Sequence, residues 1–135
     1  MSTIITDRQS ELGHWLCSRT GGEYTGSGAY IGLEKDGVIV AVSGYEDYNG
    51  ASIRAHLAAD GRLSREFIWY GFYYPFCELK VKKIIGLVSS KNEKALKLDK
   101  HFGYIEEAII KDAAPDGDLH ILTMTKEQCR FLNKP

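Results

Sequence analysis

The sequence has little of what marks secreted, metal-binding or membrane proteins. Its 135 residues contain only three cysteines, Cys17, Cys77 and Cys129, and no C-x-x-C pair. Their odd number and wide spacing argue against a disulfide scaffold or a zinc knuckle and suit a reducing compartment. The longest apolar run, residues 67–77, is too short to span a bilayer, and the polar start is unlike a signal peptide. We therefore expect a cytoplasmic protein with no membrane partner.

The chain also lacks an excess of charge and a dividing linker. It has 17 Lys and Arg and 18 Asp and Glu, which gives a formal net charge of −1. No strong overall field recruits nucleic acid, although local basic patches can still exist. His14, His101 and His120 do not cluster by spacing, so no metal site is predicted. Because the length suits one domain, we expect a single domain over residues 1–135.

Apolar spacing predicts alternating helices and strands. A helix is expected over residues 7–19, three antiparallel strands over 29–59 and a buried helix over 67–79, which Pro75 should kink or end. The other predicted elements are an edge strand at 2–5, a strand at 82–88, a helix within 89–104 and closing strands at 105–112 and 119–125. This order predicts an α/β fold with a mixed, mainly antiparallel central sheet and helices on both faces.

The segment 88–104 carries the most specific pattern in the chain. It follows V-x-x-x-N-x-x-A-x-x-L-x-x-x-x-G-aromatic, with Val88, Asn92, Ala95, Leu98, Gly103 and Tyr104 at the defined positions. Placed after a strand in this order of elements, it resembles the strand-and-helix signature of the GNAT acyltransferase superfamily. The resemblance covers roughly residues 25–125. The chain also resembles short GNAT-like proteins of bacteriophages, notably over residues 112–131.

The resemblance implies acetyl-CoA as the acyl donor, bound in a cleft where the fourth and fifth strands splay apart. Main-chain groups near Leu57 and Ala58 in the fourth strand would hold the pantetheine arm and polarise the thioester. Asn92 would contact the pantetheine near the thiol. Asn92 could equally be the N-cap of the following helix, and the two roles are compatible. A capping box of Ser90 and Glu93 is the other expected helix start.

The family binds the pyrophosphate on a loop of pattern [QR]-x-x-G-x-[GA], which falls here on residues 62–67. Arg62 matches, whereas Arg65 and a phenylalanine replace the two small residues. Glycine lets the backbone approach a phosphate closely. Either Arg62, Ser64 and Arg65, with Leu63 between them, make the contacts through side chains, or the loop binds CoA poorly. An ordinary solvated loop is a further alternative.

Asp99 is a candidate catalytic acid. It takes the position at which the family often has a tyrosine that protonates the departing thiolate, and it shares a helix face with Ala95. Only a carboxyl with a raised pKa could donate this proton. The alternatives are a contact with a cationic substrate or a salt bridge with Arg54 or a lysine. On the same helix, Lys94 and Lys97 are expected to point mostly outward.

His56, in the fourth strand, is the candidate general base. An amine must lose a proton to attack a thioester, and the pKa range of imidazole suits that task. A packed or hydrogen-bonded strand histidine is the ordinary alternative. Glu46 and Asp47, at the end of the preceding strand, are further candidates near the acceptor side or simple surface charges.

The leading hypothesis is therefore metal-independent transfer of an acetyl group from acetyl-CoA to an amine. The acceptor could be a small molecule, a protein lysine or a modified nucleobase. The changed pyrophosphate loop and the missing tyrosine favour a second hypothesis, a non-catalytic GNAT-fold binding or assembly module. A phage enzyme that modifies DNA bases is the third. An exposed last strand is compatible with a homodimer.

Overall fold

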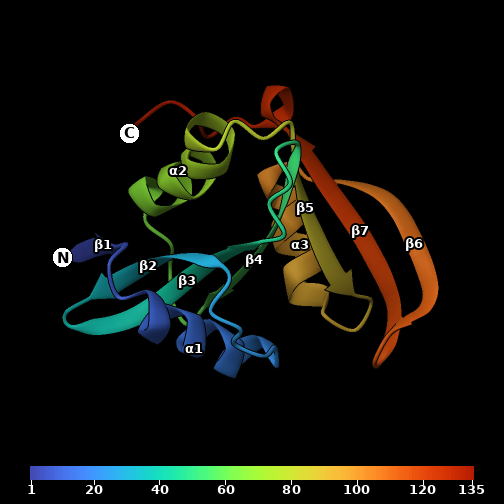
Figure 1. The fold of residues 1–135 in the computed structure, drawn as a ribbon, viewed down its shortest axis with the longest axis horizontal. Coiled ribbons are helices and arrows are strands. Elements are labelled where there is room, and N and C mark those ends of the chain that lie inside the picture. The colour runs from blue at the N-terminus through green and yellow to red at the C-terminus, as the bar shows by residue number, and fades with distance from the viewer.

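The computed structural model describes residues 1–135 and contains one seven-stranded sheet with helices on both faces (Figure 1). The strands are β1 (Ser2–Ile5), β2 (Ala29–Lys35), β3 (Val38–Glu46), β4 (Ser52–Ala59), β5 (Lys83–Ser89), β6 (Ile105–Ala114) and β7 (Gly117–Thr125). The helices are α1 (Gln9–Thr20), α2 (Arg65–Tyr73) and α3 (Glu93–Phe102), with a π-helical turn at Tyr74–Glu78 and a 3-10 turn at Lys126–Gln128. The predicted fold class is confirmed.

The strands follow the order β1-β2-β3-β4-β5-β7-β6, and only β4 and β5 run parallel. Different helices cover the two faces. On one face, α1 packs Leu12 and Leu16 against Val42 of β3. On the other, α2 and α3 meet through the rings of Phe72 and Phe102, which lie edge to face with centroids 5.5 Å apart. Burying such side chains contributes about 1.5–3 kcal/mol each, so both layers hold the sheet in place. None of the helices has the length and apolar character that crossing a bilayer requires.

The predicted aromatic helix forms and ends as Pro75 requires. Ser64 caps its start, because the Ser64 hydroxyl accepts a hydrogen bond from the Phe67 N–H at 3.1 Å. Pro75 has no N–H to continue the helical ladder. The chain therefore leaves the α-helix after Tyr73 and widens into the π-helical turn.

The helix α3 begins at Asn92, whose Oδ1 accepts a hydrogen bond from the Ala95 N–H at 3.1 Å. The alternative capping box of Ser90 and Glu93 is wrong. The Ser90 hydroxyl lies two residues before the helix cap and accepts from the Asp118 N–H of β7 at 3.0 Å instead. The turn between β5 and α3 is thereby attached to the neighbouring strand.

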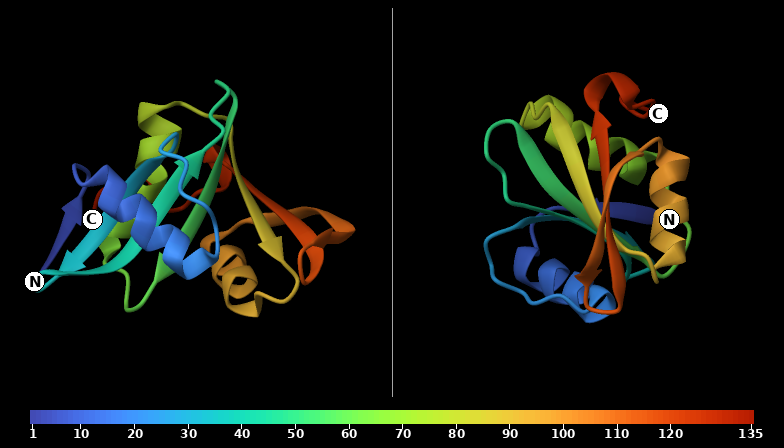
Figure 2. Two further views of the ribbon diagram at one scale, coloured as in Figure 1. Left: turned by 60° about the horizontal axis from the view of Figure 1, so that its bottom comes forward. Right: turned by 90° about the vertical axis from the view of Figure 1, so that its right-hand side faces the viewer.

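The strands β4 and β5 separate along their length. Only residues 52–54 of β4 pair with residues 83–85 of β5. Beyond that point β5 stays paired with β7, whereas β4 stays paired with β3 as far as Ala59. Figure 2 shows the two strands diverging towards their C-terminal ends. Main-chain groups of β4 that face β5 after residue 54 therefore have no strand partner.

Candidate active site

A cavity of about 860 Å³ occupies the gap between β4 and β5. Its volume falls within the range of about 300–1,000 Å³ that ligand pockets occupy. Six of the nine predicted site residues line it: His56, Leu57, Ala58, Leu63, Asn92 and Asp99. The fold thus brings together residues from β4, the β4–α2 connection and α3, and the gap between the strands opens the cavity to both faces of the sheet.

Asp99 lies on the inner face of α3, over Gly86 of β5. The Oδ2 atom of Asp99 is 3.3 Å from the position that a Cβ on Gly86 would take. Burial raises the pKa of Asp99 to about 6, the direction that the role of a proton donor requires. A carboxyl with this pKa is substantially protonated in mildly acidic solution and can donate a proton.

No cation neutralises Asp99. The predicted alternative of a salt bridge with Arg54 is wrong, because Arg54 pairs with Glu46 and Asp47. Side chains alternate along a strand, so Arg54 faces α1 on the opposite side of the sheet from Asp99. No lysine pairs with Asp99 either.

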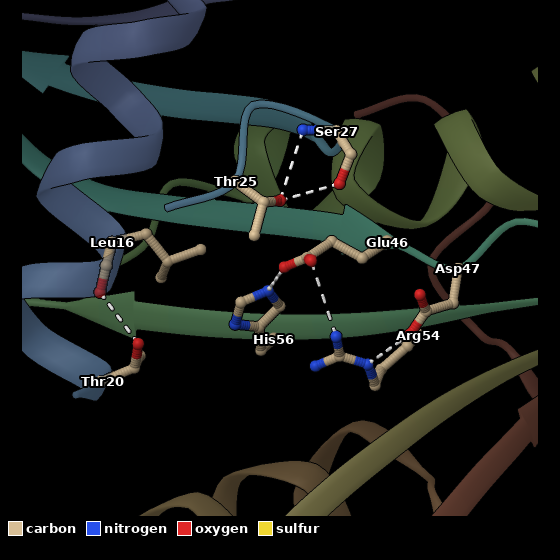
Figure 3. Close-up of polar contacts among 8 residues, drawn as sticks. All are labelled: Leu16, Thr20, Thr25, Ser27, Glu46, Asp47, Arg54 and His56. Carbon is tan, nitrogen blue, oxygen red and sulfur yellow. Dashed lines mark hydrogen bonds and ion pairs between the residues drawn. The ribbon is translucent and has the colours of Figure 1, made fainter. Parts of the chain in front are cut away.

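His56 also faces α1 and belongs to the charged group drawn in Figure 3. Its Nε2 lies 3.1 Å from Oε1 of Glu46. The other carboxylate oxygen of Glu46 lies 3.6 Å from a terminal nitrogen of Arg54, whose Nε donates to Oδ2 of Asp47 at 2.9 Å. Because a carboxylate can only accept, neutral His56 carries its proton on Nε2 and leaves Nδ1 free as a base.

The surroundings of His56 favour this neutral form. Burial lowers the pKa of the imidazole and outweighs the opposite effect of Glu46, while Arg54 lowers it further. Glu46, one of the alternative base candidates, therefore bonds His56 and influences its pKa instead of forming a separate base. A half-buried histidine that remains neutral and is oriented by a carboxylate has the geometry of a general base.

The segment that matches the family's pyrophosphate loop joins β4 to α2. Of its residues, Leu63 and Phe67 line the cavity, whereas Arg62, Ser64 and Arg65 do not. Arg62 and Arg65 are exposed, and neither forms an ion pair. Ser64 caps α2. The first N–H groups of a helix have no partner within the helix, so this end of α2 presents main-chain donors beside two free guanidinium groups.

Two further polar residues of the lining were not selected from the sequence. Tyr104 is half-buried, and burial together with the nearby Asp99 carboxylate raises its pKa. It stands at the aromatic position of the α3 pattern, but an aromatic residue after a helix usually indicates core. Lys94 is exposed, as predicted, and also lines the cavity, because a long lysine stem can lie along the cavity wall and keep its ammonium group in solvent.

Comparison with solved structures identifies the fold. The F149G mutant of the spermidine N-acetyltransferase SpeG from Vibrio cholerae matches with a TM-score of 0.77 and 15% identity, over 98% of this chain and 96% of that one. A chimera of Vibrio cholerae SpeG and hSSAT gives 0.76 and 15%, over 98% and 99%. The N-acetyltransferase PseH from Campylobacter jejuni, in complex with acetyl coenzyme A, gives 0.66 and 17%, over 93% and 99%. The chain has the GNAT fold that its sequence predicted.

No protein-family model matches the chain, and no curated protein matches it by sequence. At 15–17% identity the likeness establishes the fold alone.

Proposed function

We propose that this protein is an acetyl-CoA-dependent N-acetyltransferase that acts on an amine. One observation carries the proposal: the gap between β4 and β5 holds a candidate acid and a candidate base on opposite faces of the sheet. Asp99, with its raised pKa, lies on the α3 side, and His56, with its lowered pKa, lies on the α1 side. Pairs of titratable groups whose environments move their pKa values apart are typical of acid–base sites. The fold neighbours, which are N-acetyltransferases, support the same interpretation.

The residues of the cavity fit acetyl-CoA. The unpaired main chain of β4 near Leu57 and Ala58 can bond the pantetheine amides as an added strand would. Arg62 and Arg65, beside the start of α2, can hold the pyrophosphate through charged hydrogen bonds. Asn92, the N-cap of α3, also lines the cavity and can contact the pantetheine arm. When bound, acetyl-CoA supplies the activated acetyl group and a thiol leaving group.

The side chains divide the chemistry between the two faces. Nδ1 of His56 takes a proton from the acceptor nitrogen as the N–C bond forms. Asp99, in its protonated form, gives a proton to the sulfur as the C–S bond breaks, so one proton is taken up and one is released. A main-chain N–H of β4 near Leu57 polarises the thioester carbonyl. The strand geometry holds both reactants, which makes positioning a large part of the rate enhancement.

The test is release of free thiol from acetyl-CoA in the presence of a panel of amines. The panel contains spermidine, an amino sugar, a lysine peptide and an oligonucleotide with an amine-bearing base, because the acceptor class is open. We expect one of these amines to stimulate CoA release and to gain one acetyl group by mass spectrometry. Release without an amine, or acetylation at the same rate by heat-denatured protein, would contradict the proposal.

A non-catalytic GNAT-fold binding module is the second candidate. Arg65 and Phe67 stand where the family pattern has small residues, and this observation favours weakened contact with the pyrophosphate. Calorimetry with CoA separates the candidates. Binding of CoA with a raised melting temperature but no turnover on any amine would favour the module, since a ligand of the folded state must stabilise it. Absence of binding at millimolar CoA would contradict a CoA-dependent function of either kind.

A further inference from the structure

Four charged or titratable side chains form a continuous series from the protein surface to the cavity. The exposed fraction of the side chain is 72% for Asp47, 31% for Arg54, 17% for Glu46 and 26% for His56, which ends the series (Figure 3). Each member contacts the next through the distances given above. No step of the proposed reaction uses the other three residues, Asp47, Arg54 and Glu46.

We propose that Arg54 is a positioning residue for the candidate base: it balances the charge of Glu46, so that Glu46 orients the imidazole of His56 without holding it in the protonated form. The proposal rests on the proposed function, in which His56 accepts the proton of the amine. It assigns a task to a residue that lies outside the reacting atoms.

The need for such a balance follows from the environment of the dyad. A carboxylate next to an imidazole stabilises the imidazolium form, and more so where water is excluded. An imidazolium cannot accept a proton. If no cation offset the charge of Glu46, Glu46 would orient His56 but would also keep it protonated and unable to act as a base. The guanidinium group of Arg54, 3.6 Å from the second oxygen of Glu46, opposes this effect.

No other cation can take this part. The other titratable groups that face Glu46 are Cys17 of α1 and Tyr30 of β2, with Tyr24 beyond Tyr30. Burial first, and Glu46 second, raises the pKa of both the Cys17 thiol and the Tyr30 phenol, so these two groups are neutral at neutral pH. Arg54 is the only guanidinium or ammonium group within ion-pair distance of Glu46.

The register of the β3–β4 hairpin builds this arrangement. Glu46 pairs directly with Arg54, and Gly44 pairs with His56, so all these positions lie on the α1 face. A Cβ on Gly44 would come within 3.0 Å of Nε2 of His56, and the glycine therefore leaves the ring free to lie against Glu46. Asp47, in the left-handed conformation with φ of 60°, turns its carboxylate back onto Arg54.

The proposal is tested by the NMR titration of His56 in the free protein with two variants that act in opposite directions. Arg54→Gln removes the balancing charge and should raise the pKa of His56. Asp47→Asn leaves the guanidinium less compensated and should lower it. Arg54→Lys, which keeps the positive charge, should bring the titration back towards wild type. Arg8→Gln removes an arginine ion pair far from the cavity and serves as the control.

A structural role of Arg54 would lower the melting temperature without moving the titration of His56. A titration that stays in place, or moves down, in folded Arg54→Gln overturns the proposal, and Asp47→Asn decides the question if that variant does not fold. With an active acceptor, the acid limb of kcat/KM for Arg54→Gln should move to higher pH. On that limb the rate should fall about tenfold for each pH unit by which the pKa of His56 rises. The titration needs no turnover, so the two proposals can fail separately. If the pKa of His56 changes as expected but the protein has no transferase activity, the proposed function is refuted and the coupling of Arg54 to His56 stands.

Discussion

Asp99 and Gly86 approach each other closely across the inner wall of the cavity. The carboxylate oxygen Oδ2 lies 3.3 Å from the place where any side chain on Gly86 would begin. The missing side chain gives the carboxyl a half-buried position against the backbone of β5, where it has no ion-pair partner. The raised pKa of Asp99 therefore depends on a residue that is not itself titratable.

Gly86→Ala should displace this carboxyl and lower turnover by about tenfold, less than the hundredfold that a 1 Å misplacement can cost. Gly86 has no positive φ, so alanine fits the backbone, and the unfolding free energy should change by no more than about 1–3 kcal/mol. The measurement is kcat in single variants and in the double variant with Asp99→Asn. Because the glycine acts through Asp99, the alanine should cost little in the Asp99→Asn background. Additive losses in the double variant would contradict this.

Asp99→Asn should stabilise the protein at pH 7.5. The folded state of the wild type holds the Asp99 proton up to a pKa of about 6, against 3.8 for an exposed aspartate, so its stability falls as pH rises between these values. Above pH 6 the free energy of unfolding of the wild type is therefore lower by about 2–3 kcal/mol, whereas that of the asparagine variant is not reduced in this way. Urea unfolding should show this gain at pH 7.5 and a vanishing difference below pH 4.

The control for this prediction is Asp60→Asn. Asp60 is an exposed aspartate whose pKa is lowered by its bond to Arg19, so its replacement should give no gain at pH 7.5. An Asp99→Asn variant that is no more stable than the wild type at pH 7.5 would mean that the carboxylate has a partner when ionised. In the Asp99→Asn variant, turnover should no longer fall with pH over the range in which Asp99 deprotonates in the wild type.

His56→Gln should lower kcat/KM by about a hundredfold or more, the range that general acid–base catalysis supplies. In the wild type, activity should decline as pH falls through the pKa of His56, which burial places below the 6.5 of an exposed imidazole. The variant should lack this acid limb. The pH profile of kcat/KM with the best amine measures both effects, and His101→Gln, on the exposed end of α3, should behave as wild type. An unchanged acid limb in His56→Gln would assign the base elsewhere.

Arg62→Ala should weaken CoA binding more than Lys97→Ala does. Arg62 stands at the pyrophosphate position of the family pattern, whereas Lys97 is exposed on α3 and does not line the cavity. Loss of a charged hydrogen bond costs about 1.5–3 kcal/mol, or about tenfold or more in Kd. Calorimetry at one ionic strength compares the two, and equal losses would mean that only overall charge matters and that the loop register is misplaced.

The sequence predicted the fold well because its strongest signals are local. Pro75 ends α2, Asn92 caps α3 and Gly103 closes it with a φ of 109°, and each effect needs only neighbouring residues. Apolar periodicity and turn residues then set the order of strands and helices, which is enough to select the fold class. Ser90 was misassigned because its partner, Asp118, is distant in the chain and no local pattern indicates it.

The character of the site was decided by contacts between distant segments. The sequence placed Asp99 and His56 on suitable elements but left open whether each was paired, buried or free. Only the separation of β4 from β5 places the two residues on opposite faces of one cavity. The pKa of Asp99 depends on how completely α3 and β5 exclude water from it, and that of His56 on the opposing effects of burial, Glu46 and Arg54. Desolvation and Coulomb energies sum over everything that surrounds a group in space, so spacing along the chain cannot supply them.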